Sequence, residues 1–402
     1  MTPLFDRLDA VPTLSAEERQ LLDSVKALAR DQIMPRAAAY DRAAEFPWDN
    51  IRAINALGLN AMFVPEAYGG AGMSYAAYLA CVRELSAACA STGIIWATNF
   101  HAAKPLIDFG TEEQKRRLLP RVAEGALLAL AITEPDAGSD ATGMTTRFTP
   151  DGDEIVINGG KIFITNGDVA DLILLFGKWS EPSANPSDKN GPSDKNGRGS
   201  ISALYLEKGT PGFSVVRKED KLGHRASSTA ALAFDNCRVP RANLLGEPGG
   251  GLALLLAALN KSRPSVAAHA LGIARAAFDD AVGYINERRQ SGRRIVEFQG
   301  IQFLLADLAS ELAMCEAWLW HVAGLVDAGV ADIAVEASIL KMRASDLAMR
   351  MVTEAVQLYG GYGYIADYRV ERLLRDAKIT QIWEGTNQIH RQLIGRSFIA
   401  RG

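Results

Sequence analysis

A glutamate near the end of the chain is the side chain best suited to removing a proton. Glu384 lies in the segment WEGT at residues 383–386, between two stretches with a helical pattern. Gly385 lets the backbone turn sharply there. A carboxylate held in a dry pocket can take a weakly acidic proton from carbon. On this segment alone, however, a surface or helix-capping glutamate explains Glu384 better than a catalytic base does.

Common signatures of other chemistries are missing from the sequence. No GxGxxG, Walker A, HExxH or GxSxG motif occurs, so a Rossmann unit, a P-loop, a zinc protease and a serine hydrolase are not indicated. The five histidines show no metal-ligand spacing, and the four cysteines form no CxxC pair. We therefore predict no metal site and no disulfide framework.

Composition limits the function classes further. The chain has 402 residues, enough for about two or three domains. Its net charge of −4 gives no support for nucleic-acid binding, which usually needs a basic surface. No run of about 18 apolar residues predicts a membrane span, and the N-terminus lacks the pattern of a secretory signal. Scattered cysteines fit a reducing compartment, so we predict a cytoplasmic protein.

Hydrophobic patterning predicts an α+β multidomain protein with three parts. An N-terminal α-helical domain covers residues 1–128, a middle β-barrel or sandwich domain 129–240, and a C-terminal four-helix-bundle domain 241–402. Ser15 and Glu18 have the form of a capping box and open the first helix. The predicted helices are 15–39, 48–57, 75–89, 112–124, 251–260, 266–289, 299–328, 332–359, 370–381 and 388–396; the predicted strands are 154–158, 161–165, 171–176, 201–206, 213–216 and 230–234.

One segment of the middle domain interrupts its strand pattern. Residues 179–200 contain PSDKNG twice in succession. This composition cannot bury a core, so we predict an exposed loop between two strands.

A series of short segments, in this order along the chain, resembles the acyl-CoA dehydrogenase family. The resemblance runs from about Leu14 to Ile399, and its motif pattern is nearest to the short- and medium-chain dehydrogenases. It implies one FAD per subunit, and a homotetramer or dimer in which a neighbouring subunit completes the adenosine end of the FAD site. The segments are AITEPDAGSD (131–140), KIFITNG (161–167), KLGHRASST (221–229), NLLGE (243–247), RRQSG (288–292), FQGIQ (298–302), QLYGG (357–361), RDAK (375–378) and IWEGTNQ (382–388).

The resemblance implies FAD contacts in the middle domain. Thr133 and nearby backbone donors would hydrogen-bond the flavin, and Phe163 would pack on it where relatives often carry Trp. On spacing alone, residues 162–164 are simply a half-buried strand. The implied contacts are Leu130, Ile132, Thr133, Ser139, Phe163, Ile164 and Thr165.

Further FAD contacts are implied for the C-terminal domain. Arg288 would reach across the subunit interface to the pyrophosphate, for which its guanidinium fork is well suited. Ser291 stands where relatives commonly have Phe, so the packing of the adenine is expected to differ. Taken alone, Arg288 belongs to a solvated helix end, and Gly360 could be a helix C-cap. The implied contacts are Arg288, Gln290, Phe298, Gln299, Gln357, Gly360, Gly361, Thr386 and Gln388.

The resemblance also assigns the base and the substrate contacts. It places the base at Glu384, whereas some relatives carry theirs on the helix near residues 260–263. Ser262 occupies that second position and cannot act as a base. Trp96 is bulky, which favours a short or medium acyl chain, and Thr92 replaces the arginine that glutaryl-CoA relatives use. The implied substrate contacts are Ser139, Asn260, Arg263, Gly385, Trp96 and His101.

The activity implied is α,β-dehydrogenation of an acyl-CoA to its trans-2-enoyl product. Electrons would then pass to an electron-transferring flavoprotein. Three alternatives stay open at this point: an acyl-CoA oxidase, a desulfinase-like or monooxygenase-like flavoenzyme, and a helical scaffold that has lost FAD. His101 takes a usually apolar position, where it could admit a polar or aromatic acyl group or simply hydrogen-bond inside a helix pair.

Overall fold

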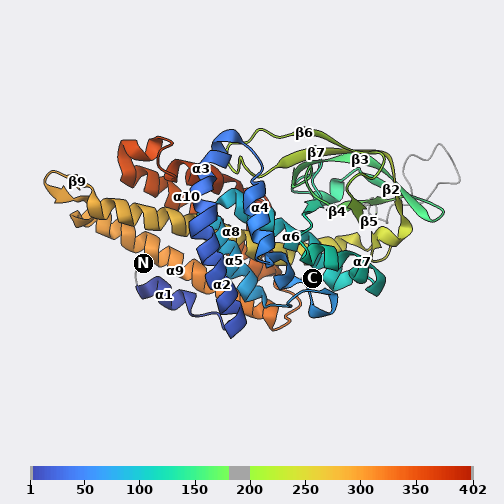
Figure 1. The fold of residues 1–402 in the computed structure, drawn as a ribbon, viewed down its shortest axis with the longest axis horizontal. Coiled ribbons are helices and arrows are strands. Elements are labelled where there is room, and N and C mark those ends of the chain that lie inside the picture. The colour runs from blue at the N-terminus through green and yellow to red at the C-terminus, as the bar shows by residue number, and fades with distance from the viewer. Residues whose placement is uncertain (1–2, 181–199, 400–402) are drawn as a thin grey trace.

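The computed structural model describes residues 3–180 and 200–399. Helices fill the centre of an elongated molecule, the β-sheet lies at one end, and the small hairpin that contains β9 (Arg289–Gln290) lies at the other (Figure 1). The predicted order of a helical, a sheet and a second helical part is confirmed. The duplicated PSDKNG segment lies outside the described residues.

The N-terminal helices are built around two that are buried almost all round. α5 (Tyr75–Ala88) and α6 (Ala90–Phe109) lie against each other and against α8 (Gly251–Glu287) of the C-terminal part. The capping box is confirmed, because Ser15 accepts from the backbone of Glu18 while Glu18 accepts from that of Ser15. The helices are α1 (Pro3–Asp9), α2 (Ala16–Leu28), α3 (Met34–Ala43), α4 (Trp48–Ala56), α5 (Tyr75–Ala88), α6 (Ala90–Phe109) and α7 (Glu112–Ala123).

The middle part is an eight-stranded sheet with its own apolar core, which includes Phe148, Ile164 and Leu175. Neighbouring strands follow the order β6-β7-β3-β2-β4-β5-β8, and β1 pairs in parallel with β4. Two predicted strands, 154–158 and 161–165, are one strand with irregular register. The strands are β1 (Leu128–Ala131), β2 (Arg147–Asp151), β3 (Glu154–Thr165), β4 (Leu172–Trp179), β5 (Ile201–Glu207), β6 (Phe213–Lys218), β7 (Thr229–Pro240) and β8 (Leu244–Leu245).

The C-terminal part is organised around one long helix. The prediction of separate helices at 251–260 and 266–289 was wrong, because α8 runs unbroken through the buried Pro264. Packing against α5, α6 and α10 outweighs the local cost of a proline in a helix. The elements are α8 (Gly251–Glu287), β9 (Arg289–Gln290), β10 (Arg293–Arg294), α9 (Gln299–Asp327), α10 (Ala334–Tyr359), α11 (Val370–Ala377) and α12 (Asn387–Ser397).

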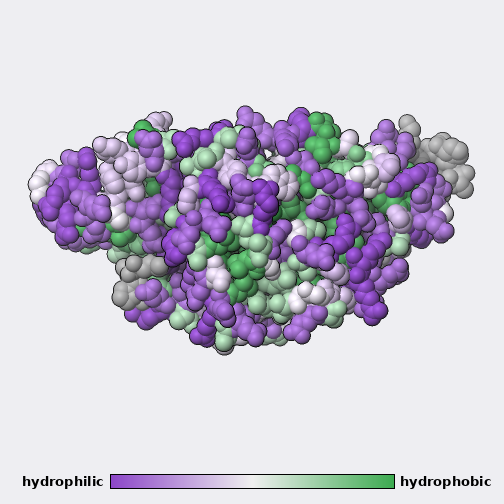
Figure 2. Space-filling view, in the orientation of Figure 1, coloured by the Kyte–Doolittle hydropathy of each residue, from purple (hydrophilic) through white to green (hydrophobic). Residues whose placement is uncertain are grey.

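The surface is mixed in polarity. Hydrophilic residues dominate the face shown in Figure 2, and an apolar patch overlies β6, where Val215 and Val216 are exposed. No helix in residues 3–180 or 200–399 combines the length and the apolar character that crossing a bilayer demands.

Candidate active site

Glu384 lies in a strained turn directly before α12. Its φ of 52° is in the left-handed region, and Gly385 follows with a φ of 92°. This φ is strained for any residue with a Cβ, and a Cβ on Gly385 would also lie only 3.1 Å from Nε2 of His390, so the turn favours glycine. Thr386 caps α12 by accepting a hydrogen bond from the backbone of Ile389. Non-glycine residues in this conformation are uncommon and persist where the surroundings hold them.

Ser262 of α8 holds the carboxylate itself. Its hydroxyl donates to Oε2 of Glu384 at 2.6 Å. The sequence excludes Ser262 as a base but does not indicate that it contacts the base. A serine at this point of α8 therefore orients Glu384.

Lys341 of α10 holds the backbone of the turn. Its ammonium donates to the carbonyl of Gly385 at 2.7 Å and to Oδ1 of Asn387 at 3.1 Å, and its side chain is 0% exposed. Burial lowers the pKa of Lys341 to about 7, although the Glu384 charge acts in the opposite direction. No carboxylate of the described residues forms an ion pair with it. Sequence reasoning missed Lys341, and its one signal is a lysine on a helix face that is otherwise apolar or small.

Two predicted substrate contacts lie on α8 beside Ser262. Arg263 is buried and donates to Oδ1 of Asn260 at 3.4 Å. Burial lowers the pKa of Arg263, and the charge of Glu384 opposes that effect. The charge of Glu384 thus acts on the buried Arg263, although the two side chains form no direct ion pair.

Two more predicted substrate residues, Trp96 and His101, lie where α5, α6 and α8 meet. Nε2 of His101 is 2.9 Å from the hydroxyl of Ser265, which is 2.8 Å from the hydroxyl of Tyr78. The ring of Trp96 packs 5.4 Å from that of Tyr78. Burial lowers the pKa of His101, whereas the Glu384 charge raises it.

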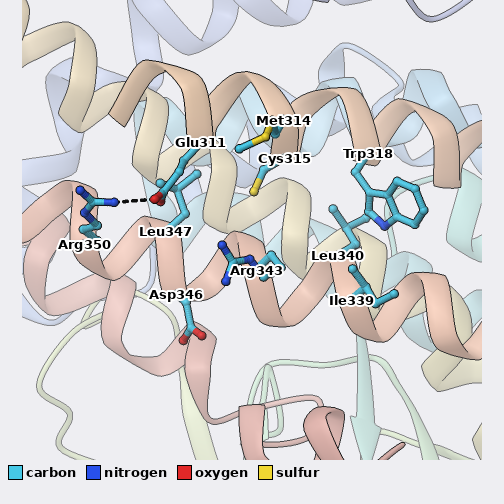
Figure 3. Close-up of a pocket in the computed structure, with 10 residues that line it drawn as sticks. All are labelled: Glu311, Met314, Cys315, Trp318, Ile339, Leu340, Arg343, Asp346, Leu347 and Arg350. Atoms are coloured by element: carbon cyan, nitrogen blue, oxygen red, sulfur yellow. Dashed lines mark hydrogen bonds and ion pairs between the residues drawn. The ribbon is translucent and has the colours of Figure 1, made fainter. Parts of the chain in front are cut away.

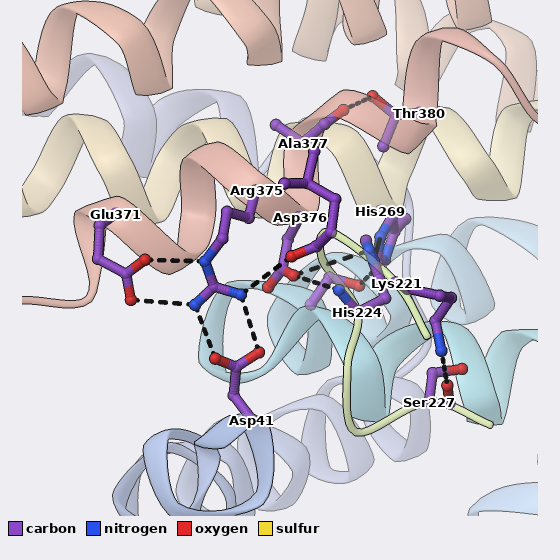
Figure 4. A network of polar contacts seen from close by, with 12 residues as sticks. Asp41, Lys221, His224, Ser227, His269, Glu371, Arg375, Asp376, Ala377 and Thr380 are labelled. Atoms are coloured by element: carbon purple, nitrogen blue, oxygen red, sulfur yellow. Dashed lines mark hydrogen bonds and ion pairs between the residues drawn. The ribbon is translucent and has the colours of Figure 1, made fainter. Parts of the chain in front are cut away.

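Behind the turn, two histidines join the C-terminal helices to the sheet. Nε2 of His224, in the loop between β6 and β7, is 2.9 Å from Nε2 of His269 on α8. Both rings pack against Trp383, the residue before Glu384. The network continues through Asp376, which accepts from the backbone of His224 (Figure 4). Arg375, beside it in sequence, pairs with Asp41 of α3 and Glu371 of α11.

A buried ion pair joins the two segments of the sheet that carry the predicted flavin contacts, residues 130–139 and 163–165. Lys161 contacts Oε1 of Glu134 at 2.7 Å and the carbonyl of Ile132 at 2.9 Å. Burial alone would raise the pKa of Glu134, but the Lys161 ammonium and the bonds from Thr145 and Thr146 lower it to about 2. Burial also lowers the pKa of Lys161 to about 8. This pair fixes the turn that follows β1.

Beside that turn, β3 carries an exposed aromatic residue, Phe163. The backbone of Thr133 accepts from that of Ile162 at 2.9 Å, which places the end of β1 beside β3. Phe163 is 61% exposed and has a φ of 60°. The side chain of Ile164 points into the sheet core, so only its backbone can reach a ligand. Of the other predicted contacts, Leu130, Ile132 and Thr165 are half-buried and Ser139 is exposed.

A second group of predicted cofactor residues surrounds a hollow of about 520 Å³ at the far end of α8. Arg288 stacks over the ring of Tyr362 at 5.4 Å. Phe298 and Gln299 lie at the start of α9, outside the lining, and Gln388 is exposed on α12. Gly360 is also the C-cap of α10, as the alternative explanation expected. The predicted residues in the lining are Arg288, Gln290, Gln357, Gly360 and Gly361.

The two groups of predicted cofactor residues are far apart within one chain. The sheet and the β9 hairpin lie at opposite ends of the molecule (Figure 1). Ser262 and Glu287 are 25 residues apart on α8, or about 37 Å along the helix axis. The β9 hairpin next to Arg288 is therefore far from the sheet that carries Phe163 in the same chain. Among the described residues, no cluster of histidine, cysteine or acidic side chains could hold a metal ion.

Comparisons with known proteins identify the family. Models of the acyl-CoA dehydrogenase N-terminal, middle and C-terminal domains match residues 15–126, 129–237 and 249–399. An acyl-CoA dehydrogenase of Bacillus subtilis is 42% identical over 385 residues, covering 95% of this chain and 98% of the relative.

Solved structures agree with that result. Butyryl-CoA dehydrogenase from Megasphaera elsdenii has a TM-score of 0.89 and 37% identity, covering 96% of this chain and 99% of its own. A glutaryl-CoA dehydrogenase from Mycobacterium smegmatis in complex with FADH2 has a TM-score of 0.87 and 27% identity, covering 98% and 96%. The chain belongs to the acyl-CoA dehydrogenase family, whose members are FAD flavoproteins and oxidoreductases.

Proposed function

We propose that this acyl-CoA dehydrogenase converts an acyl-CoA thioester to its trans-2-enoyl product, with Glu384 taking the α-proton. The observation that carries the assignment is the strained turn at Glu384, whose carboxylate is bound by Ser262 and whose backbone is bound by Lys341. A fixed carboxylate aimed at carbon is what this proton transfer requires. FAD, when bound, supplies the acceptor for the hydride that leaves the β-carbon.

The sheet-side residues fit a flavin. Phe163 is 61% exposed, and its backbone has a φ of 60°, a strained conformation of the kind that clusters at ligand sites. A ligand that packs on the ring would bury its exposed apolar surface. Trp383 adds a buried Nε1 that has no hydrogen-bond partner in the described part of the chain. In this assignment Phe163 packs on the ring system, and Thr133, Thr165 and the backbone of the 131–139 turn provide donors.

The helices would orient the thioester. Asn260 and Arg263 lie within one turn of Ser262, so a CoA arm running past them brings its acyl end to Glu384. Ser139 and the backbone at Glu384 and Gly385 provide further donors, and Trp96 limits the depth of the acyl region. Donors aimed at the thioester oxygen stabilise the negative charge that develops as the α-proton leaves.

A second copy of the chain would complete the cofactor site. Arg288 and the hollow around it lie toward the opposite end of the molecule from the sheet, so we assign them to the FAD of a neighbouring subunit. The outer faces of α9 and α10 support self-association, because a groove of about 430 Å³ runs between them (Figure 3). Phe303 and Met314 on α9 are exposed as well. We propose a homotetramer, or a dimer, that covers this surface.

We propose an electron-transferring flavoprotein as the acceptor and the cytoplasm as the location. The test is anaerobic titration of the purified yellow protein with acyl-CoA thioesters, with flavin absorbance as the readout. Bleaching is expected, and steady-state turnover should be faster with an electron-transferring flavoprotein than with oxygen. Faster turnover with oxygen would identify the protein as an oxidase. A colourless purified protein would support the alternative of a helical scaffold that has lost FAD.

Mixed oligomers test the shared site. Glu384→Gln removes the base, and Arg288→Ala weakens FAD binding in the neighbour. In an oligomer that carries one chain of each, one site combines both defects, while the other has an intact Glu384 and an intact Arg288. Co-expression should therefore restore activity that neither variant shows alone at limiting FAD. No restoration in isolated mixed oligomers would place both residues in the same chain's site.

A further inference from the structure

A second polar group lies one helical turn from the base. Ser262 Oγ is 2.6 Å from Oε2 of Glu384, and Ser265, three residues further along α8, has its Oγ 2.9 Å from Nε2 of His101. Residues three apart on a helix lie on the same face, with Cβ atoms about 5–6 Å apart. An acyl chain that extends from Glu384 along α8 for one helical turn, about 5.4 Å, would reach the imidazole of His101 about three to four carbon–carbon bonds beyond the atom that Glu384 would deprotonate.

The hydrogen bonds around Ser265 leave one ring nitrogen of His101 without a partner. Tyr78 reaches the carbonyl of Ala97 at 3.2 Å and Ser265 at 2.8 Å. The hydroxyl of Ser265 also forms a hydrogen bond with Nε2 of His101, and the tautomer of His101 decides which of the two groups donates. Within residues 3–180 and 200–399, no hydrogen bond reaches Nδ1 of His101. Nδ1 is therefore a free acceptor in one tautomer and a free donor in the other.

The rings next to the Ser265 network are aromatic. Tyr78 stacks on Phe100 with ring centroids 4.1 Å apart, and the rings of Tyr75 and Trp96 lie within 6 Å of Tyr78. His101 is 4% exposed, and burial lowers its pKa, which keeps the imidazole neutral. A neutral ring offers no counter-charge to a carboxylate, and Glu384 would repel one.

We propose that the enzyme prefers a short acyl chain that carries a neutral hydrogen-bonding group, a hydroxyl above all, on its fourth or fifth carbon, and that His101 binds this group. This proposal rests on the proposed function. A hydroxyl both donates and accepts, so it satisfies either tautomer of His101. A methyl group in its place offers Nδ1 no hydrogen bond and displaces water from it, and sites of this kind discriminate against the analogue that lacks the polar group.

The test compares two thioesters that differ only in the terminal group. 5-Hydroxypentanoyl-CoA and hexanoyl-CoA place a hydroxyl or a methyl on the same carbon. The ratio of their kcat/KM values, from flavin reduction, should favour the hydroxy compound about tenfold or more in the wild type and fall by about the same factor in His101→Leu. Dividing one ratio by the other cancels the intrinsic reactivity of the two compounds.

Two further variants separate recognition from packing. The amide of Asn follows the position of Nδ1, so His101→Asn should retain much of the preference. The amide of Gln follows Nε2, so His101→Gln keeps the bond to Ser265 and should lose the preference. FAD content and circular dichroism check that each variant is folded.

The outcomes separate this proposal from the proposed function. Equal ratios in the wild type and His101→Leu, with rapid bleaching by hexanoyl-CoA, would overturn the role of His101 and leave the dehydrogenase intact. Faster reduction by glutaryl-CoA than by the hydroxy compound would overturn the neutral substrate class. If no thioester bleaches the flavin, the proposed function itself fails.

Discussion

The turn at Glu384 and the hairpin at Arg288 are built in opposite ways. Side chains from α8 and α10 bind the turn, and the rings of His224 and His269 pack behind it. The hairpin is exposed at the end of the molecule. Its arginines contact residues close to them in sequence, as when Arg294 pairs with Glu297. One region is completed within the chain, and the other presents charge outward.

This difference follows from what each region has to do. Proton transfer from carbon depends on the placement of the carboxylate to a fraction of an ångström, and a single chain's core provides that rigidity. Binding a phosphate requires charge and a fork of donors, which an exposed arginine can deliver to a neighbouring chain. We therefore expect the turn to control rate and the hairpin to control cofactor affinity.

The largest effect should come from the base. Glu384→Gln keeps the size and the bond to Ser262 but removes the proton acceptor. Flavin reduction by an acyl-CoA should slow by about 10⁴-fold, the upper range for general base catalysis, while the FAD content stays the same. Stopped-flow absorbance measures the rate.

Glu113→Gln is the matched control, because Glu113 is exposed on α7 and far in sequence from the turn. It should behave as the wild type does. Reduction of Glu384→Gln at the wild-type rate would remove Glu384 from the reaction.

The next effect should come from Lys341→Met. Methionine fills the buried space but releases the carbonyl of Gly385 and the side chain of Asn387. A displacement of about 1 Å can slow catalysis by about 10²-fold, so kcat should fall by about that factor. KM for the acyl-CoA and the FAD content should change little, because the Lys341 ammonium is bonded to the carbonyl of Gly385 and to the side chain of Asn387 and would act through them.

Lys208→Met is the control, since Lys208 is exposed in the turn after β5. A rise in KM with unchanged kcat in Lys341→Met would show that the lysine acts on substrate binding. Loss of FAD would show a general structural role instead.

At the hairpin, adjacent arginines give the sharpest contrast. Arg288 lines the hollow and Arg289 does not. Arg288→Ala should weaken FAD binding by about 10- to 100-fold, the range for losing a hydrogen bond to a charged group, whereas Arg289→Ala should have little effect. Fluorescence titration of the apoprotein with FAD measures both. Equal effects would indicate that net charge at the tip, and not one fork, binds the cofactor.

The sequence predicts the architecture because its signals are local. The capping box at Ser15 and Glu18 forms as expected, and the change from helical to strand periods near residue 129 matches the start of the sheet part. Pro264 misled the prediction, since a local rule against proline in helices takes no account of burial against three other helices.

The sequence predicts only those site residues that lie within the ordered motifs of the family. The segment around Glu384 is recognisable, but Lys341 is 43 residues away and its role depends on a tertiary contact. Ser262 is visible only as a position where a base is missing, although it binds Glu384 directly. The roles given to the predicted FAD contacts stay predictions, because no ligand contact tests them.

The smallest expected effect concerns the pH dependence of the network behind Trp383. Burial raises the pKa of Asp376 from 3.8 to about 7, although the backbone bond from His224 opposes this. In the unfolded chain the carboxyl loses its proton near pH 4, whereas in the folded chain it keeps the proton to about pH 7. The folded state therefore binds more protons across this window, and its stability falls as pH rises through it.

Asp376→Asn removes this titration and keeps an oxygen that can accept from His224. The thermal midpoint of the variant minus that of the wild type should increase as pH rises from 4 to 7. Above pH 7 this difference should stay constant. The exposed Asp23→Asn is the control, and its difference from the wild type should stay flat. A constant difference for Asp376→Asn would mean that Asp376 is already ionised at pH 4, held by Arg375 and Arg372. The network behind Trp383 would then be held by ion pairs, as the hairpin at Arg288 is. The turn at Glu384 and the hairpin would then differ in burial alone.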